Sequence, residues 1–181
     1  MGADGTIWTK TYTNNITTSI NFYDVVGNSN STGIVIDRID TNKPSVTNIT
    51  YTPSTATSGD VEVTITTNKP IWEPVGRTGA GTTRTKVYTA NGDESFTITD
   101  AVGNTGEVEV HINRIDKEAP EATSVTYSPN TNTNGSVTVT LTTNEPVQFI
   151  PGRTGGPTTW TKIYTANTTE QVIFYDLVGN E

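Results

Sequence analysis

The sequence repeats itself with a period of 76 positions, and this repeat limits the possible folds more than any other feature of the chain. When the chain is shifted along itself by 76 positions, without a gap, half of the positions in 40–105 are identical to those in 116–181. The N-terminal stretch follows the same register. This is visible in a short motif that occurs three times: DVVGN at 24–28, DAVGN at 100–104 and DLVGN at 176–180.

The repeat divides the chain into three units. We expect a partial unit at 1–37 that holds only the C-terminal half of a repeat, a complete unit at 38–113, and a unit at 114–181 that lacks its last strand. A domain of this small size buries only about 60% of its unfolded surface, so we expect neighbouring units or bound ions to add to its stability. The linkers are short and end in proline, which predicts a stiff connection.

The composition favours strands over helices. Threonine supplies 39 of the 181 residues, and valine and isoleucine fill most apolar positions. These β-branched side chains suit the pleated surface of a sheet. Apolar and polar residues alternate with period two in two stretches of the complete unit: Val61, Val63 and Ile65, and Val108, Val110 and Ile112. This alternation is typical of half-buried strands.

Shorter stretches complete the expected unit. Ile49 and Tyr51 lie on one face of a first strand, Ile71 and Trp72 begin a short third strand, and Phe96 and Ile98 face inward in a later one. Six or seven short antiparallel strands without any helical period predict an all-β fold. We expect tandem immunoglobulin-like antiparallel β-sandwiches with a 76-residue repeat, and a small barrel is the alternative.

Several strings of the third unit occur together: a linker I-D-x-x-x-P at 115–120, VTYSP at 125–129, TNGSVTVTLTTNEPV at 133–147, YTANTTEQV at 164–172, and DLVGN. Together they resemble the bacterial immunoglobulin-like repeats (Big type) of large extracellular proteins of Gram-positive bacteria. The resemblance implies an extracellular location, secreted or attached to the cell wall or surface. It also implies a stalk of the adhesin or surface-layer type, which holds a terminal domain away from the wall.

Charge and cysteine content narrow the function classes. The formal net charge of −8 repels polyanions, which disfavours nucleic-acid binding. The chain has no cysteine, so a secreted form has neither disulfides nor a thiolate metal site. No apolar run approaches the roughly 20 residues of a membrane-spanning helix, so we expect no membrane insertion.

The aspartate of the D-x-V-G-N motif is the strongest chemical feature. In each copy it continues the inward parity of the preceding strand, so it places a carboxylate at the end of the core. A buried charge needs partners. One interpretation is a hairpin turn whose backbone N–H groups donate to the aspartate. The other is calcium, a hard cation that takes six to eight oxygen ligands.

For calcium, the ligands would come from the turn aspartate, from the linker, and from loop carbonyls. The linker offers Asp37 and Asp40, or Asn113 and Asp116. The resemblance implies the same ion, because related extracellular arrays use calcium to stiffen their junctions. The sequence leaves the turn and the metal open. The predicted metal set is Asp24, Asp37, Asp40, Asp100, Asp116 and Asp176.

The GRTG loops at 76–79 and 152–155 carry Arg77 and Arg153. Either arginine could bind a carboxylate, a phosphate or a sugar hydroxyl, which makes a carbohydrate- or protein-binding module the alternative function. The other interpretation is structural. The glycines then satisfy a tight turn, and each arginine lies over a neighbouring strand or pairs with an acid of its own unit.

The remaining candidates favour packing or solvent exposure. His111 is the only histidine and faces outward, and no Ser-His-Asp arrangement or phosphate loop is present. We interpret the acid pairs Asp93–Glu94 and Asp60–Glu62 as solvated charges, because Thr169, Ser136 and Thr138 stand at three of the repeat positions. We interpret the tryptophans as semi-buried packing residues: Trp8, Trp72 and Trp160. We therefore expect no enzymatic activity.

The sequence predicts a structural spacer or stalk whose partners are neighbouring units of the same kind. We expect the third unit to lack the strand that would pair with 171–176. The first unit has apolar strand residues but lacks the half of the sandwich on which they would pack. Unpaired strand edges seek partners. We therefore expect residues 5–36 to dock by strand addition on the open third unit of another molecule, or to fold back on the third unit of the same chain. The first case makes head-to-tail self-association a further expectation.

Overall fold

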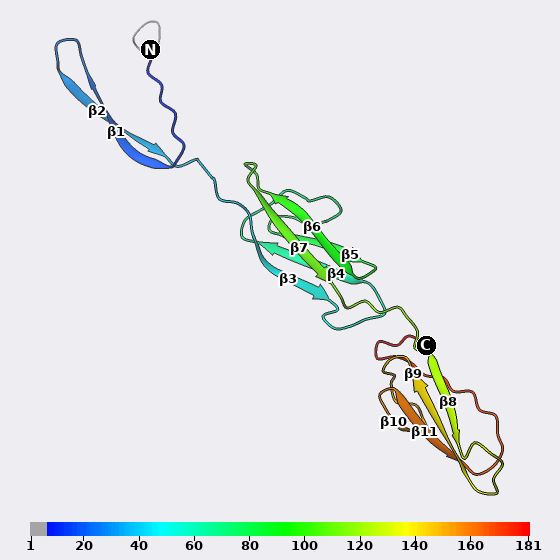
Figure 1. The fold of residues 1–181 in the computed structure, drawn as a ribbon. Coiled ribbons are helices and arrows are strands. Elements are labelled where there is room, and N and C mark those ends of the chain that lie inside the picture. The colour runs from blue at the N-terminus through cyan, green and yellow to red at the C-terminus, as the bar shows by residue number, and fades with distance from the viewer. Residues whose placement is uncertain (1–6) are drawn as a thin grey trace.

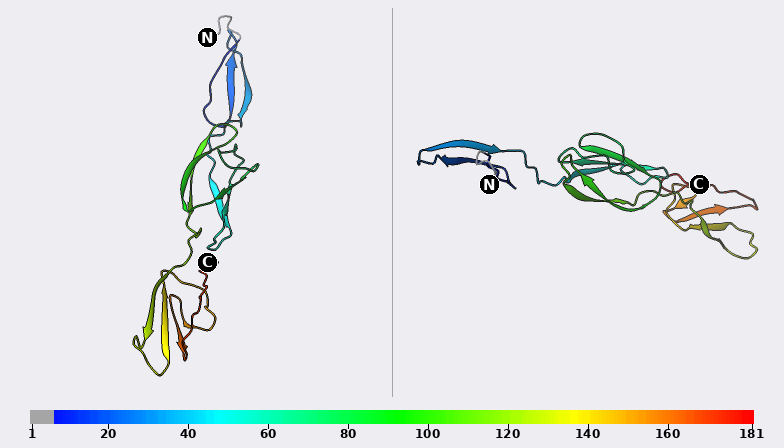
Figure 2. Two further views of the ribbon diagram at one scale, coloured as in Figure 1. Left: turned by 90° about the vertical axis from the view of Figure 1, so that its right-hand side faces the viewer. Right: turned by 90° about the horizontal axis from the view of Figure 1, so that it is seen from above.

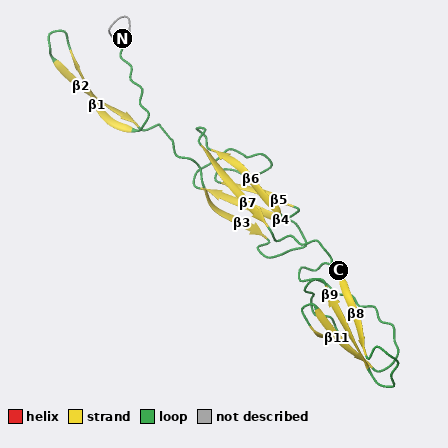
Figure 3. Ribbon diagram, in the orientation of Figure 1, coloured by secondary structure: helices red, strands yellow, loops and turns green. Residues whose placement is uncertain are grey.

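The computed structural model describes residues 7–181, and these residues form strands and loops only. The prediction of an all-β fold is confirmed (Figure 3). Nothing in the described part of the chain forms a helical segment with the length and apolar character needed to cross a bilayer. The strands lie in four antiparallel sheets along an elongated molecule. Figures 1 and 2 show the first and third units at opposite ends and the C-terminus beside the junction of the second and third.

Unit 1 (7–37) is a single hairpin. Its strands β1 (Ile16–Tyr23) and β2 (Ser29–Ile36) pair antiparallel over their whole length. No third strand of the described residues joins this sheet. Its apolar side chains are consequently open to solvent, and Phe22 is 49% exposed.

Unit 2 (38–113) contains two sheets that face one another across a core. One sheet has the order β3-β4-β5 and the other pairs β6 with β7. The bounds are β3 (Val46–Thr52), β4 (Val61–Thr67), β5 (Thr83–Tyr88), β6 (Gly92–Thr99) and β7 (Thr105–Ile112). This arrangement is consistent with a β-sandwich.

The core of unit 2 follows from the period-two pattern. Successive strand side chains point to opposite faces, so every second residue of β4 and β7 reaches the space between the sheets. Phe96, also predicted to face inward, is half-buried, and the other predicted inward residues of β4, β6 and β7 are buried: Val61, Val63, Ile65, Ile98, Val108, Val110 and Ile112. The predicted outward residues of β7, including His111, are exposed.

Unit 3 (114–181) has one four-stranded sheet with the order β10-β11-β9-β8. The bounds are β8 (Ala122–Ser128), β9 (Val137–Thr143), β10 (Thr154–Gly155) and β11 (Thr159–Tyr164). Strands β8, β9 and β11 begin and end 76 positions after β3, β4 and β5. Its core is smaller, built on Leu141, Val147, Ile150 and Trp160.

Two strand predictions were wrong. The short third strand at Ile71 and Trp72 is only an isolated bridge between Ile71 and Asp100, so unit 2 has five strands rather than six or seven. The stretch 171–176 forms no strand, and only its last residue makes a bridge, to Val147. Apart from this bridge, the stretch has no ladder partner among the described residues, so it lacks the repeated inter-strand hydrogen bonds that define a strand.

Candidate functional site at the unit junctions

The aspartate of each D-x-V-G-N motif accepts hydrogen bonds from its own turn. In unit 2, Asp100 Oδ1 accepts from the backbone N–H of Val102 at 3.1 Å and of Asn104 at 2.9 Å. The amide Nδ2 of Asn104 donates to Asp100 Oδ2 at 3.0 Å. Asp24 and Asp176 make the same kinds of contact in their own turns. The turn interpretation therefore describes all three copies.

Burial and hydrogen bonding act in opposite directions on Asp100. The side chain is almost fully buried, and desolvation by itself would raise its pKa. The hydrogen bonds from Asn104, Lys69 and Val102 outweigh this effect and lower the pKa of Asp100 to about 2. The carboxylate is thus ionised at neutral pH and is stabilised by donors that surround it.

A second group of polar side chains holds the linkers. Asn91 of unit 2 makes two hydrogen bonds to the backbone of linker residue Ile115: its Nδ2 donates to the carbonyl at 2.7 Å, and its Oδ1 accepts from the N–H at 2.9 Å. Asn15 of unit 1 makes the same two hydrogen bonds to Ile39: its Nδ2 donates to the carbonyl at 3.0 Å, and its Oδ1 accepts from the N–H at 2.9 Å. Each unit therefore fixes the isoleucine of the linker that follows it.

The next linker residue is bound by the unit that follows the linker. Asn180, in the turn of unit 3, donates from Nδ2 to the carbonyl of Asp116 at 3.0 Å. In unit 2, Asn104 makes the equivalent bond to the carbonyl of Asp40 at 3.1 Å. Two consecutive linker residues are thus bound by amide side chains from the two flanking units, which we call the linker clamp.

Further contacts fix the linker between units 2 and 3. Thr57 exchanges backbone hydrogen bonds with the linker, accepting from Asp116 at 2.8 Å and donating to Arg114 at 2.9 Å. The Arg114 guanidinium lies 4.1 Å from the centre of the Tyr51 ring. Ser58 Oγ donates directly across the junction to the carbonyl of Val178 at 3.4 Å.

The turn aspartate of unit 2 shares an ammonium group with the linker. Lys69 Nζ donates to Asp40 Oδ2 at 2.8 Å, to Asp100 Oδ2 at 3.1 Å, and to the carbonyl of Asn42 at 2.6 Å. A cationic group therefore already lies between the two aspartates that were predicted as metal ligands.

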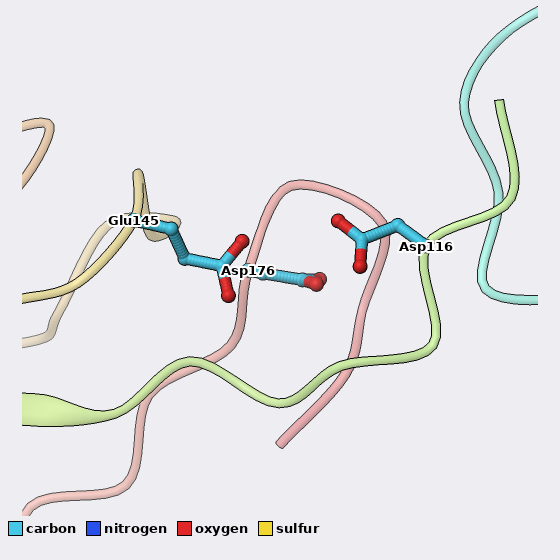
Figure 4. A group of neighbouring side chains, drawn as sticks. All are labelled: Asp116, Glu145 and Asp176. Atoms are coloured by element: carbon cyan, nitrogen blue, oxygen red, sulfur yellow. The ribbon is translucent and has the colours of Figure 1, made fainter. Parts of the chain in front are cut away.

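Unit 3 has a carboxylate where unit 2 has this lysine. Glu145 follows Asn144 as Lys69 follows Asn68, so the strings TTNKP and TTNEP differ in the sign of one charge. Carboxylate oxygens of Asp116, Glu145 and Asp176 lie within 4.8 Å of one another, and the three side chains converge from three separate segments (Figure 4). Desolvation, followed by repulsion from Asp116 and Asp176, raises the pKa of Glu145. We call this group the carboxylate cluster.

The structure regroups the predicted metal ligands. In units 2 and 3 the turn aspartate lies near the linker that precedes its own unit, so Asp100 lies with Asp40 and Asp176 with Asp116. Asp24 and Asp37 belong to no group of three metal-ligating side chains among the described residues. Sequence reasoning missed Lys69 and Glu145, although the charge reversal at one repeat position was a visible signal.

Arg77 of the first GRTG loop is directed into its own unit. Its side chain is 0% exposed. Nη2 donates to Tyr88 Oη at 2.7 Å and to Glu94 Oε2 at 2.9 Å, and the guanidinium lies 3.8 Å from the centre of the Phe96 ring. A ligand outside the unit finds no exposed donor on Arg77. The in-unit pairing is the second of the two alternatives left open by the sequence.

Arg153 repeats this arrangement more loosely in unit 3. Nη2 donates to Tyr164 Oη at 3.2 Å, but it lies 3.9 Å from Glu170 Oε2. The turn itself depends on Gly79 and Gly155. Gly79 has φ +126°, and a Cβ added there would lie 2.5 Å from the carbonyl oxygen of Thr83.

Three further interpretations need correction. Glu94 is not a solvated charge, because it accepts from Arg77, Tyr88 and Lys86. Its recurrence as Glu170 was the available signal. Trp8 and Trp72 are exposed, and only Trp160 packs in a core.

Comparison with protein-family models, with curated proteins and with solved structures finds no match to this chain.

Proposed function

We propose that this chain is a stiff spacer: a tandem array of immunoglobulin-like β-sandwiches with a 76-residue repeat, from the stalk of a secreted or surface-attached bacterial protein. The linker clamp is the observation that carries this proposal. A flexible tether needs linker residues that rotate freely, whereas Ile115 and Asp116 are both hydrogen-bonded to side chains of the adjoining units. A spacer keeps its two ends at a fixed separation only if its junctions resist bending.

The absence of cysteine and the net charge of −8 are compatible with this role. High net charge keeps a long array soluble, and packing alone holds each unit together. The two arginines that suggested a carbohydrate- or protein-binding module are directed into their own units, so the GRTG loops support the spacer rather than a ligand site.

Spin-label distances between units 2 and 3 test the spacer directly. Thr50→Cys and Thr126→Cys place labels on exposed, equivalent positions of β3 and β8 in a chain without other cysteines. The expected distance distribution is narrow, and Asn91→Ala should broaden it because Ile115 loses both hydrogen bonds. Asn113→Ala is the matched control, an exposed linker neighbour. A broad distribution in the parent protein would contradict the spacer.

We further propose that the carboxylate cluster of unit 3 binds a calcium ion. Three carboxylates supply up to six oxygens, which fits the number that calcium requires. The support comes from unit 2, where the equivalent aspartates hold the ammonium of Lys69. In unit 3 the same two positions face Glu145, and a bound cation would supply there the charge that Lys69 supplies in unit 2.

The substitution Glu145→Lys separates this proposal from simple charge repulsion. Calcium should raise the melting temperature of the chelator-treated parent protein, because a ligand that binds only the folded state stabilises it by mass action. Glu145→Lys should raise the melting temperature without calcium and abolish the calcium response. Glu62→Lys, the same change at an exposed strand position, should keep the response. An unchanged melting temperature of the parent protein at millimolar calcium would contradict the calcium proposal.

A further inference from the structure

The asparagine of unit 2 that binds the following linker is itself followed by glycine. Asn91–Gly92 and Asn134–Gly135 are the two Asn-Gly pairs of the sequence. Asparagine is a chemically labile residue, and it deamidates fastest before glycine, because the next backbone nitrogen attacks its side chain and glycine has no Cβ to shield that nitrogen. The equivalent residue of unit 1, Asn15, precedes the β-branched Ile16. The two junctions therefore share their hydrogen bonds but differ in chemical reactivity.

Solvent reaches the Asn91–Gly92 pair from outside. Both residues are exposed, and a Cβ added to Gly92 would meet no atom within 4 Å. An open hollow of about 540 Å³ lies beside the pair, and Asn91, Ile115 and Lys117 are among the residues that line it. Water can therefore take the proton from the Gly92 nitrogen, and it is at hand for the hydrolysis that completes a deamidation.

The linker clamp restrains the Asn91 amide. Its Nδ2 and Oδ1 both bond to the backbone of Ile115, at 2.7 and 2.9 Å. Ring closure would bring Cγ of Asn91 onto the Gly92 nitrogen, and this movement withdraws the amide from Ile115. Both hydrogen bonds must therefore break before the reaction begins, so the closed junction protects the residue that holds it closed.

We propose that Asn91 is a self-modification site that irreversibly releases the junction between units 2 and 3. When the clamp opens, the backbone nitrogen of Gly92 loses its proton to solvent and attacks Cγ of Asn91. The new N–Cγ bond closes a succinimide ring while the Cγ–Nδ2 bond breaks, and Nδ2 takes a proton from solvent and leaves as ammonia. Water then opens the ring at either carbonyl, which gives aspartate or isoaspartate. Water is the only co-reactant, and nothing is oxidised or reduced.

Either product removes the donor that the clamp requires. The oxygen that replaces Nδ2 is an acceptor, and so is the carbonyl of Ile115, so the 2.7 Å hydrogen bond cannot re-form while the new carboxylate is ionised. Isoaspartate also lengthens the main chain by a methylene group just before β6. The junction of units 1 and 2 keeps its amide because Ile16 shields the attacking nitrogen. The loss of stiffness rests on the spacer proposal, whereas the covalent chemistry does not.

Peptide mapping by mass spectrometry, after incubation of the full chain at mildly alkaline pH, tests the chemistry. In denaturant, Asn91 and Asn134 should deamidate at similar rates, because both precede glycine. In the folded protein, Asn134 lies in the exposed loop between β8 and β9 and should react nearly as fast as in denaturant. The two hydrogen bonds of the clamp should slow Asn91 by roughly 30-fold. Asn15 should keep its amide throughout.

Arg114→Ala should loosen the clamp without changing Asn91 itself. Arg114 holds the linker, because its guanidinium lies 4.1 Å from the centre of the Tyr51 ring and its Nη1 donates to a backbone carbonyl at 2.7 Å. The variant should accelerate deamidation of Asn91 and leave that of the loop asparagine unchanged. Arg38→Ala is the matched control at the equivalent repeat position, where the arginine side chain is 96% exposed, and it should change neither rate.

The aspartate product tests the consequence. Asn91→Asp should broaden the distance distribution between spin labels at positions 50 and 126, and Asn134→Asp should leave it narrow. A broad distribution in the parent protein would refute the spacer, and the loss of stiffness with it, while the deamidation rates would still decide the chemistry. Equal rates at Asn91 and Asn134 in the folded protein, an unchanged Asn91 rate in Arg114→Ala, or a narrow distribution in Asn91→Asp would each overturn the proposal.

Discussion

At the scale of single residues, one repeat position determines the sign of the charge that lies beside the turn aspartate of each unit. In unit 2, Lys69 donates one hydrogen bond to Asp100; burial by itself would raise the pKa of Asp100, but the bonds from Asn104, Lys69 and Val102 outweigh it. Glu145 places Asp176 among carboxylates instead. The same repeat position therefore places an ammonium group beside the turn aspartate in unit 2 and a carboxylate beside it in unit 3.

These two environments predict opposite pH responses. The folded-state pKa of Asp100 is lowered to about 2 from an ordinary 3.8, so its contribution to stability is present above pH 3.8 and is lost as pH falls toward 2. The pKa of Glu145 is raised, so its contribution is present below its ordinary pKa of 4.5 and is lost as pH rises through the raised value.

Carboxyl carbon NMR titration in chelator checks both directions. The Asp100 signal should titrate with a midpoint near 2, and the Glu145 signal should titrate above 4.5. A Glu145 midpoint at its ordinary value of 4.5 would contradict the presence of the carboxylate cluster in solution.

At the scale of elements, the GRTG loop shows how a backbone requirement positions a buried charge. Gly79 has φ +126°, a conformation that L side chains rarely adopt, and a Cβ added there would lie 2.5 Å from the Thr83 carbonyl oxygen. This turn precedes β5 and positions Arg77 so that it donates hydrogen bonds to Tyr88 and Glu94. The loop therefore places a buried arginine in the core of unit 2.

Gly79→Ala should destabilise unit 2 by roughly 2 kcal/mol, since backbone strain at such a position costs of order 1–3 kcal/mol. Gly59→Ala is the matched control, because an added Cβ there meets only Thr57 Oγ1 at an ordinary 3.5 Å. Denaturant unfolding of the two variants measures the difference. Equal stabilities would show that the loop relaxes around the new side chain at little cost.

Alternating side chains made the strands of unit 2 predictable, because every second residue of β4 and β7 must enter the same core. The buried end of β6 at Asp100 was predictable for the same reason. The grouping of Asp116 with Asp176 was not, since the contact joins residues 60 positions apart through loops without periodicity. The prediction that Trp72 is a semi-buried packing residue was wrong, because a single exposed loop position has no periodic pattern from which burial could be inferred.

At the scale of the whole molecule, stiffness depends on how few free torsions separate the units. The linker isoleucine after units 1 and 2 is bound by an asparagine of that unit, and the next linker residue is bound by an asparagine in the D-x-V-G-N turn of the following unit. The same clamp thus occurs at both junctions of the described chain. A longer array with this junction would extend in one direction rather than coil.

Small-angle scattering of the 181-residue protein, at dilutions where its mass is that of one chain, tests this stiff-rod account most directly. An eight-residue strand such as β7 spans roughly 26 Å. Three such units in line with their linkers make a rod of roughly 90 Å, with a radius of gyration of roughly 26 Å. The account predicts this value, together with the scattering profile of a rod. A radius of gyration of about 16 Å, that of a compact globule of the same length, would contradict it.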